Sequence, residues 1–461
     1  MVQKPQVFDG GWGTAYRIRR AGQGRAMDYA QARAWLEQVA KKRGMVLGLD
    51  AMRALLDRLG NPQNQLHFIH IAGTNGKGSV SAFLERILIC AGYHTGAYTS
   101  PAVFDFCEPY RIDGVQISKD AFAACMEKIA AAAEETERET GLHPTEFEQE
   151  TALAFLWFAQ NHCEPVVLET LLGGDLDATN VVTGVVCSVL TSISIDHRRV
   201  LGNTLTEIAG HKAGIMLPKV PAVSDRQAEE AAAVLAKRAK ELEIPLIWAD
   251  PEQMREEEED ETGMTVSYRE WQHLRVSQRA LWQLRNLAVV LEAVDVLRKQ
   301  GYRIPDQAVR DGVEQMYWPG RFEVIPEAKL MDGSAAVRLV LDGAHNPGGA
   351  KALRESLDHC FPKERRVFVM GVLADKDYRT VIRTLLPGVS NAIAIASDSP
   401  RALPAEQLAA AIREEFPQIS VCVADSVREA LKKAVLDAET DGIIVVCGSL
   451  SFLKDVRTAL V

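Results

Sequence analysis

The chain has 461 residues, 47% of them hydrophobic and 25% charged, which is enough for two or three domains with large cores. Acidic residues outnumber basic ones, 62 against 52, and the net charge of −10 argues against a general nucleic-acid-binding protein. No apolar run reaches the ~18 residues that a membrane span needs, and eight scattered cysteines without a C-x-x-C pair predict reduced thiols in a cytoplasmic protein.

The chain opens with residues 1–26, which are rich in glycine and arginine and weakly patterned, so we expect an N-terminal extension there. Apolar residues at helical spacing then predict two helices, residues 29–40 and 50–59. Asp50 is the expected N-cap of the second helix, and Gly-Asn-Pro at residues 60–62 is its expected end.

A glycine-rich turn, H-I-A-G-T-N-G-K-G-S at residues 70–79, separates a predicted buried strand from a predicted helix. Strand, glycine turn and helix form a geometry that binds phosphate, because backbone N–H groups converge at a helix N-terminus. Lys77 is placed to neutralise the β- and γ-phosphates of ATP, and the Ser79 hydroxyl to ligate Mg²⁺. The predicted ATP-binding loop comprises Gly73, Thr74, Asn75, Gly76, Lys77, Gly78 and Ser79.

This turn departs from the usual P-loop pattern G-x-x-x-x-G-K-[ST]. Ile71 stands where the pattern has its first glycine, and Gly78 separates Lys77 from Ser79. A purely structural glycine turn is therefore the alternative. The strand before the turn and the helix after it favour a nucleotide site.

Three segments after the turn carry further polar groups. A long segment, residues 100–114, follows a predicted strand, and loops of this length are usually functional or disordered. Residues 144–151, P-T-E-F-E-Q-E-T, open an apolar helix, and Thr145 with Glu148 three residues on fits a capping box. His197 follows another predicted strand; such a histidine is more often structural, but a strand end beside a phosphate loop favours a ligand.

The C-terminal third alternates strand and helix after W-P-G-R-F-E at residues 318–323, a Pro-Gly turn from which Arg321 can reach phosphate. The alternation predicts a second α/β sheet, with D-G-A-H-N-P at residues 342–347 at a strand end, where ligands gather. The predicted strands are residues 337–341, 366–370, 392–396, 421–423 and 443–446, and the predicted helices are residues 351–359, 378–385, 405–416 and 427–437.

The order of these motifs resembles the Mur ligase superfamily and, within it, the bifunctional folylpolyglutamate synthase/dihydrofolate synthase family. The similarity runs from about residue 27 to the C-terminus and rests on G-T-N-G-K-G-S, T-x-F-E, D-A-T-N, D-H, K-A-G-I, P-G-R-F-E and D-G-A-H-N-P. It implies an α/β fold in two parts. Residues 27–317 would form a P-loop ATP-binding, Mur-ligase-like domain with a mostly parallel sheet, and residues 318–461 a smaller, Rossmann-like glutamate-ligase domain.

The resemblance also implies roles for individual residues. It gives Lys77, Lys212, His197 and Glu148 catalytic roles. Mg²⁺ would be held by Ser79, Glu148 and His197, with Asp196 orienting His197, and by Lys212 if CO₂ carboxylates that lysine. Besides the loop, ATP would contact Asn286, Arg321, Asp342 and His345. Folate would lie against Gly44, Met45, Val46, Leu47, Ser100, Pro101, Leu176 and Asp177, and L-glutamate against Asp375, Lys376 and Asp377.

Two of these assignments have structural alternatives, and five positions depart from the family pattern. The capping box is the alternative role of Glu148, and an unmodified surface lysine is the alternative for Lys212. The departures are Ala102 for histidine, Pro109 for arginine, Leu171 for glycine, Asp175 for arginine and His211 for glutamate.

The activity implied by the resemblance is ATP-dependent amide ligation. A carboxylate of tetrahydrofolate or dihydropteroate would attack the γ-phosphate, and the amine of L-glutamate would then displace phosphate from the acyl phosphate. The enzyme would act as a cytoplasmic monomer, with no nucleic acid or membrane as partner. The alternatives are another Mur-type ligase acting on a cell-wall UDP-sugar precursor, a P-loop ATPase or kinase, and an inactive folate-binding paralogue.

Overall fold

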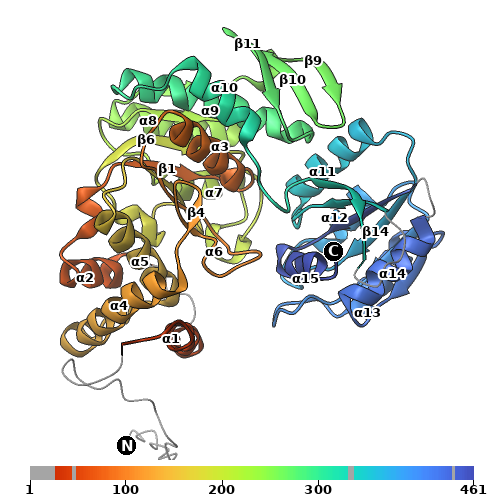
Figure 1. Ribbon diagram of the computed structural model, residues 1–461, viewed down its shortest axis with the longest axis horizontal. Coiled ribbons are helices and arrows are strands. Elements are labelled where there is room, and N and C mark those ends of the chain that lie inside the picture. The colour runs from red at the N-terminus through yellow and green to blue at the C-terminus, as the bar shows by residue number, and fades with distance from the viewer. Residues whose placement is uncertain (1–25, 44–47, 331–336, 439–441, 461) are drawn as a thin grey trace, which may run out of the picture.

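The computed structural model describes residues 26–43, 48–330, 337–438 and 442–460, and its strands form three β-sheets (Figure 1). Residues 1–25 of the expected N-terminal extension lie outside these ranges. So do four of the predicted folate contacts, Gly44, Met45, Val46 and Leu47. None of the helices in the described ranges is both long and apolar enough to cross a lipid bilayer.

The first sheet has eight strands in the order β4-β3-β2-β5-β1-β6-β7-β8. Its six strands from β2 to β8 run parallel, and β3 and β4 extend one edge antiparallel. The strands are β1 (Phe68–Ala72), β2 (Gly96–Tyr98), β3 (Tyr110–Ile112), β4 (Val115–Gln116), β5 (Val166–Glu169), β6 (Val185–Leu190), β7 (Ala222–Ser224) and β8 (Leu246–Trp248). All five residues of β1 are buried, as expected for a central parallel strand.

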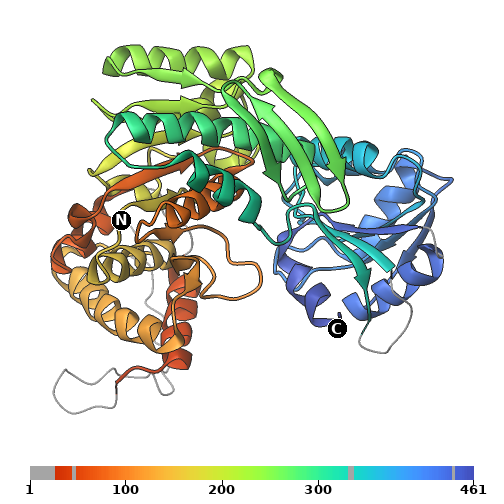
Figure 2. The same cartoon turned by 45° about the horizontal axis from the view of Figure 1, so that its top comes forward.

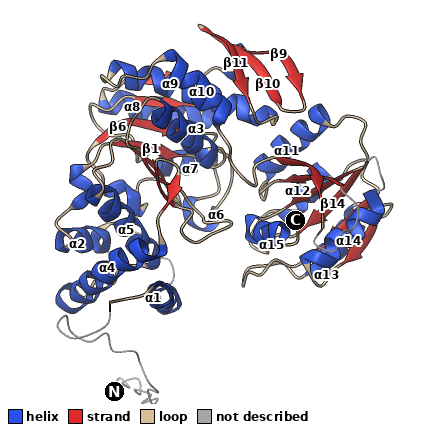
Figure 3. Cartoon of the chain, viewed as in Figure 1, coloured by secondary structure: helices blue, strands red, loops and turns tan. Residues whose placement is uncertain are grey.

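Helices cover both faces of this sheet (Figure 3). The odd residues of β1, such as Ile69, pack with α3 (Lys77–Cys90), α9 (Leu281–Lys299) and α10 (Asp306–Gln315). The opposite face of the sheet packs on a second set of helices. There the rings of Phe68 and Phe155 lie with their centroids 5.5 Å apart. Those helices are α1 (Tyr29–Arg43), α2 (Asp50–Arg58), α4 (Lys119–Thr140) and α5 (Glu146–Gln160), and three more complete the domain: α6 (Arg198–Leu201), α7 (Leu205–Ala213) and α8 (Glu229–Leu242).

A second sheet of three antiparallel strands lies where the two lobes of the molecule, one built around each large sheet, meet (Figure 2). It consists of β9 (Met254–Asp260), β10 (Gly263–Tyr268) and β11 (Trp271–Val276). Glu259 of β9 lies 2.9 Å from His359 Nε2 in the C-terminal lobe and 2.6 Å from Arg279 Nε. The small sheet therefore contributes contacts between the lobes.

The third sheet has six strands in the order β12-β13-β17-β14-β15-β16. Five of them are parallel, and β12 (Glu323–Ala328) adds an antiparallel edge that the sequence did not predict. The others are β13 (Val337–Leu341), β14 (Arg366–Met370), β15 (Asn391–Ala394), β16 (Ser420–Val423) and β17 (Ile443–Cys447). The helices are α11 (Pro347–Cys360), α12 (Tyr378–Leu385), α13 (Ala405–Glu415), α14 (Val427–Ala438) and α15 (Leu453–Thr458).

The predicted second α/β sheet is thus present, with each predicted element within a few residues of its observed bounds. The prediction of an N-cap at Asp50 was wrong, because α2 starts at Asp50 and the preceding Leu49 makes no side-chain cap. The Asp50 carboxylate still lies in the first turn, where it opposes the positive end of the helix dipole. The domain boundary after residue 317 stays a prediction.

Buried His70 on β1 should make the protein less stable in mild acid. Its Nε2 lies 2.9 Å from Thr179 Oγ1, and burial lowers the pKa of His70 to about 3 from 6.5. Below pH 6.5 the unfolded chain binds a proton that the folded chain does not, so the free energy of unfolding falls by about 1.4 kcal/mol per pH unit from this group. Urea unfolding between pH 7 and pH 4 should show a shallower slope for His70→Gln than for wild type. The same change at His67, whose side chain is 52% exposed, is the control; equal slopes for all three proteins would contradict this assignment.

Candidate active site between the two large sheets

The turn between β1 and α3 has the backbone that its glycines predict. Gly76 has a φ of 91°, a left-handed conformation that other residues rarely adopt, and α3 begins at the next residue, Lys77. A Cβ atom on Gly73 would come within 1.8 Å of Thr191 Oγ1, and one on Gly76 within 2.4 Å of Asn286 Oδ1. The two glycines therefore let the loop lie against its neighbours, and Asn286, a predicted ATP contact, lies beside it.

The Lys77 side chain lies inside this loop. Its Nζ is 3.2 Å from the carbonyl oxygen of Gly73, 3.4 Å from that of Thr74 and 3.9 Å from Glu169 Oε1. Burial lowers the pKa of Lys77, and the negative charge of Glu169 partly offsets that effect. An ammonium group at the N-terminus of α3 is well placed to neutralise phosphate.

Glu169, at the C-terminal end of β5, is the carboxylate that faces Lys77. Its side chain is 4% exposed, its Oε2 is enclosed without a hydrogen-bond partner, and burial raises its pKa to about 7 against the opposing charge of Lys77. The backbone N–H of Ser100 donates to Glu169, and the Ser100 hydroxyl is likewise enclosed without a partner. Two enclosed oxygen atoms without protein partners suit a hard divalent cation.

Glu169 was not among the residues predicted from the sequence, and Ser100 was predicted to contact folate alone. The signal that could have found Glu169 is an acidic residue directly after a short apolar run, because a charge at the end of a buried strand needs a partner there.

Glu148 does not belong to this group. Its Oε2 accepts hydrogen bonds from the Thr145 N–H at 2.7 Å and the Thr145 hydroxyl at 2.8 Å. These contacts form the capping box of α5, and Glu148 lies beside Met52 of α2. The prediction of Glu148 as a magnesium ligand and catalytic residue is therefore corrected: its carboxylate closes a helix end, and Glu169 occupies the place beside the loop.

Asp196 and His197 follow β6 and face the C-terminal sheet. Asp196 Oδ1 accepts a hydrogen bond from Lys376 Nζ at 2.6 Å, and its Oδ2 accepts one from Asn346 at 3.1 Å. Burial alone would raise the pKa of Asp196, but His345 and Lys376 hold it well below its usual range. Partial burial and the charge of Lys376 lower the pKa of His197 to about 4, so the neutral imidazole is available as a ligand.

The phosphate loop itself also contacts the C-terminal sheet. Asn346 Nδ2 donates to Asn75 Oδ1 at 3.0 Å, and Asn75 Nδ2 donates back to Asn346 Oδ1 at 3.3 Å. Asp342 holds the turn that presents Asn346, since its carboxylate accepts the N–H groups of Phe322 and Ala344 at 2.8 Å each. The two parts of the predicted ATP site, from opposite ends of the chain, thus meet.

Of the three predicted glutamate-binding residues, only Lys376 reaches across to the first sheet. Asp375 pairs with Arg401 at 3.1 Å, and Asp377 caps α12 by accepting the N–H of Thr380. Lys376 and its partner Asp196 each have side chains only 9% exposed. Lys376 is therefore the member of this group placed at the site.

Lys212 lies buried under the phosphate loop, in the last turn of α7. Its Nζ donates to the carbonyl oxygen of Gly73 at 2.7 Å, and the residue is 3% exposed. Burial and then the charge of Lys77 lower the pKa of Lys212 to about 7. The alternative of a surface lysine is therefore wrong, and a sizeable fraction of the amine is neutral near pH 7.

A small pocket brings several of the predicted residues together. It is lined by Gly73, Thr74, Lys77, Leu171, Leu172, Gly173, Asp196, His197, Leu201 and Lys212. Asp177 braces one wall, since its carboxylate accepts the N–H groups of Leu171 and Leu172 at 3.0 and 2.8 Å, and Leu176 nearby is 41% exposed. Arg321 follows the Pro-Gly turn at residues 319–320, and its charge acts on both Lys77 and Glu169.

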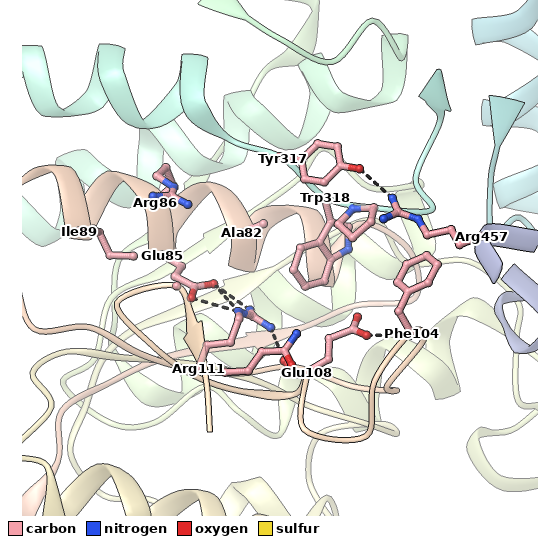
Figure 4. Close-up of a pocket in the computed structure, with 13 residues that line it drawn as sticks. Ala82, Glu85, Arg86, Ile89, Phe104, Glu108, Arg111, Tyr317, Trp318 and Arg457 are labelled. Carbon is pink, nitrogen blue, oxygen red and sulfur yellow. Dashed lines mark hydrogen bonds and ion pairs between the residues drawn. The ribbon is translucent and has the colours of Figure 1, made fainter. Parts of the chain in front are cut away.

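A larger pocket of about 360 Å³ lies between α3 and the segment of residues 317–319 (Figure 4). In it Arg111 donates three hydrogen bonds of 2.8 to 3.1 Å to Glu85, and its guanidinium lies 5.1 Å from the ring of Trp318. Trp318 in turn packs on the phosphate loop, since a Cβ on Gly78 would come 3.0 Å from its Nε1. Pro109 departs from the arginine of the family pattern, and Arg111, two residues on, supplies the positive charge of this segment.

The chain is similar in sequence to known ligases and synthases. Residues 320–450 match the family model of the glutamate ligase domain of Mur ligases. The chain is 35% identical over 440 residues to the dihydrofolate synthase/folylpolyglutamate synthase of Bacillus subtilis, covering 94% of this chain and 99% of that protein. It is 34% identical over 420 residues to the folylpolyglutamate synthase of Lacticaseibacillus casei, covering 88% and 92%.

Solved structures give the same relationship. The folylpolyglutamate synthase of Mycobacterium tuberculosis, complexed with ADP and AMPPCP, superposes with a TM-score of 0.83 at 30% identity and covers 94% of this chain and 98% of its own. An Escherichia coli protein in complex with DHPP and ADP superposes with a TM-score of 0.79 at 30% identity, covering 93% and 97%.

Proposed function

The chain belongs to the dihydrofolate synthase/folylpolyglutamate synthase family, and from this premise we propose how its site joins L-glutamate to a folate carboxylate. The protein is an ATP-dependent ligase of the Mur type. One observation carries the assignment of the site: the phosphate loop with Lys77 meets the D-G-A-H-N-P turn of the other sheet through Asn75 and Asn346. A reaction that must bring three substrates together fits such a junction.

The residues at this junction meet the main electrostatic demand of the reaction. A carboxylate is a poor acyl donor, so the substrate carboxylate takes the γ-phosphoryl group of ATP and becomes an acyl phosphate. The attacking carboxylate and the triphosphate are both anions, and Lys77 and Arg321 reduce their repulsion. The amine of L-glutamate then attacks the acyl carbonyl and phosphate leaves. Asp196 holds Lys376 at the side from which we propose that L-glutamate enters.

We propose that Mg²⁺ belongs between Glu169, Ser100 and His197. The enclosed Glu169 Oε2 and Ser100 Oγ lack protein partners, and His197 is neutral near pH 7. Bound there, the cation would neutralise charge on the transferring phosphoryl group. Ser79, in the first turn of α3, stays a further candidate ligand.

We propose that CO₂ carboxylates Lys212. A carbamate forms only from the neutral amine, and the pKa of about 7 leaves that form available above pH 7. After removal of CO₂, activity should fall and return with bicarbonate. Carbamate formation from the neutral amine and CO₂ releases a proton, so at equal dissolved CO₂ the initial rate of recovery should be about tenfold higher at pH 8 than at pH 6, where most of the amine is protonated. Lys212→Met should not respond to bicarbonate. Wild-type rates that ignore bicarbonate at both pH values would contradict the proposal.

We propose that both dihydropteroate and reduced folates are acceptors, bound against Ser100, Pro101, Leu176 and Asp177. The exposed apolar side chain of Leu176 offers a flat ring a contact beside the pocket.

We also propose that the enzyme acts as a monomer in the cytoplasm. Light scattering of the purified protein tests the first of these two points, and fractionation of the cells that produce it tests the second.

The deciding experiment for the activity is phosphate release from Mg-ATP with L-glutamate, in the presence of dihydropteroate, tetrahydrofolate or no acceptor. Products are weighed by mass spectrometry. We expect an acceptor-dependent rate and a mass gain of one glutamyl unit on each acceptor. Phosphate release that needs no acceptor would support the ATPase alternative. No turnover with any acceptor would support an inactive paralogue, and turnover only with a UDP-sugar precursor would support another Mur-type ligase.

A further inference from the structure

Two departures from the family pattern, Asp175 and His211, lie in contact with each other. His211 Nδ1 is 2.9 Å from Asp175 Oδ1 and 3.0 Å from Asp175 Oδ2, so the imidazole is centred on the carboxylate. The two positions are 36 residues apart in the chain, one in the loop after β5 and one in α7. The family pattern that the sequence resembles has arginine and glutamate at these two positions. In this chain a carboxylate and an imidazole from two separate segments thus face each other.

The backbone at this contact is closely packed. The Asp175 N–H donates to the carbonyl oxygen of His211 at 2.9 Å, and Asn180 Nδ2 donates to the carbonyl oxygens of Asp175 and Gly214 at 3.1 and 3.3 Å. A Cβ atom on Gly174 would come within 2.5 Å of the His211 carbonyl oxygen, and within 3.0 Å of Lys212 Cα. Small shifts of either segment are thus passed to the other.

The contact joins the two groups that support the phosphate loop. The loop that carries Asp175 begins directly after Glu169, which faces Lys77. His211 is the residue before Lys212, whose Nζ holds the carbonyl oxygen of Gly73 in the phosphate loop. The Asp175–His211 pair therefore connects the loop that follows Glu169 with helix α7, which carries Lys212.

We infer that Asp175 and His211 act as one positioning unit, which fixes Lys212 and the loop after Glu169 relative to the phosphate loop and can be replaced only as a pair. This inference rests on the proposed function for its kinetic consequence. It gives the two departures, Asp175 and His211, one shared role.

The test is a double-mutant cycle with the polarity reversed. His211→Glu alone places two carboxylates together, and Asp175→Arg alone places a guanidinium against the imidazole. We expect each single variant to lower kcat by about five- to tenfold, with KM for ATP changed less, since residues in direct contact couple to this extent. The double variant Asp175→Arg/His211→Glu should return to within about twofold of wild type.

A second measurement does not depend on turnover. Hydrogen exchange followed by mass spectrometry should show faster exchange in residues 171–177 and 205–214 for each single variant, and wild-type rates for the double variant. The matched control is His67→Glu, which places a carboxylate beside Glu164 in an exposed histidine–acid pair of 3.0 Å, and which should leave kcat unchanged.

Two results would overturn the inference: single variants with wild-type kcat and exchange, or a double variant whose losses are the product of the single losses. If the wild type lacks ligase activity, the proposed function fails while the exchange measurement still decides the coupling. Thermal unfolding of all four proteins separates loss of position from loss of fold, since a partly exposed pair of this kind contributes little stability.

Discussion

Lys77→Ala should lower kcat for glutamate ligation by about a thousandfold or more, because its ammonium group neutralises the phosphoryl group in transfer. Nζ already lies inside the phosphate loop, within 3.4 Å of two loop carbonyl oxygens. A side chain that stops at Cβ cannot reach the phosphates from there. Initial rates of acceptor-dependent phosphate release, with products weighed, measure the effect.

The Lys77→Ala protein should remain folded. Removing a buried cation also removes its desolvation cost, and Glu169 beside it can take up a proton because its pKa is about 7. Lys237→Ala is the control, since that side chain is 79% exposed on α8 and should leave the rate unchanged. A Lys77→Ala enzyme with more than about a tenth of wild-type kcat would show that another group neutralises the phosphates.

Glu169→Gln should lower kcat by about a hundredfold or more and raise the Mg²⁺ concentration needed for half-maximal rate. The amide has nearly the same shape but removes the negative charge that faces Lys77 and the proposed cation. Rates measured over a range of Mg²⁺ at saturating ATP separate weaker metal binding from a lower maximal rate.

The comparison variant is Glu148→Ala. Loss of the capping box should lower the free energy of unfolding by about 1 kcal/mol, while the Mg²⁺ dependence of the rate stays as in wild type. A thermal melt and a magnesium titration on each of the two variants therefore distinguish the roles. The opposite pattern, with magnesium dependence altered only by Glu148→Ala, would restore the interpretation taken from the sequence.

The elements and the phosphate loop could be predicted because their signals are local. Buried strands such as β1, and helices such as α11 beside the C-terminal sheet, have an apolar pattern within one segment. The glycines of the loop are needed for close approach within a few residues of it. The capping box of Thr145 and Glu148, which was the alternative to the preferred magnesium role, is also a local signal, and it is present.

The remaining errors concern contacts between distant segments. Glu169 gains its role only when the end of β5 lies beside β1, so that its carboxylate faces Lys77. Asp175 and His211 were interpreted as two separate departures, because the sequence around each residue does not indicate that the other is its partner. The antiparallel strand β12 was missed because an edge strand depends on the neighbour it pairs with, here β13.

The hydrogen bonds between Asn75 and Asn346 and between Asp196 and Lys376 have a thermodynamic consequence. They join the two large sheets through atoms that lie at, or next to, the phosphate loop. A nucleotide that binds more tightly at one mutual orientation of the sheets must favour that orientation by the same factor. By this linkage, a substitution that shifts the balance between orientations of the two sheets also changes nucleotide affinity, even when the substituted residue lies far from the phosphate loop.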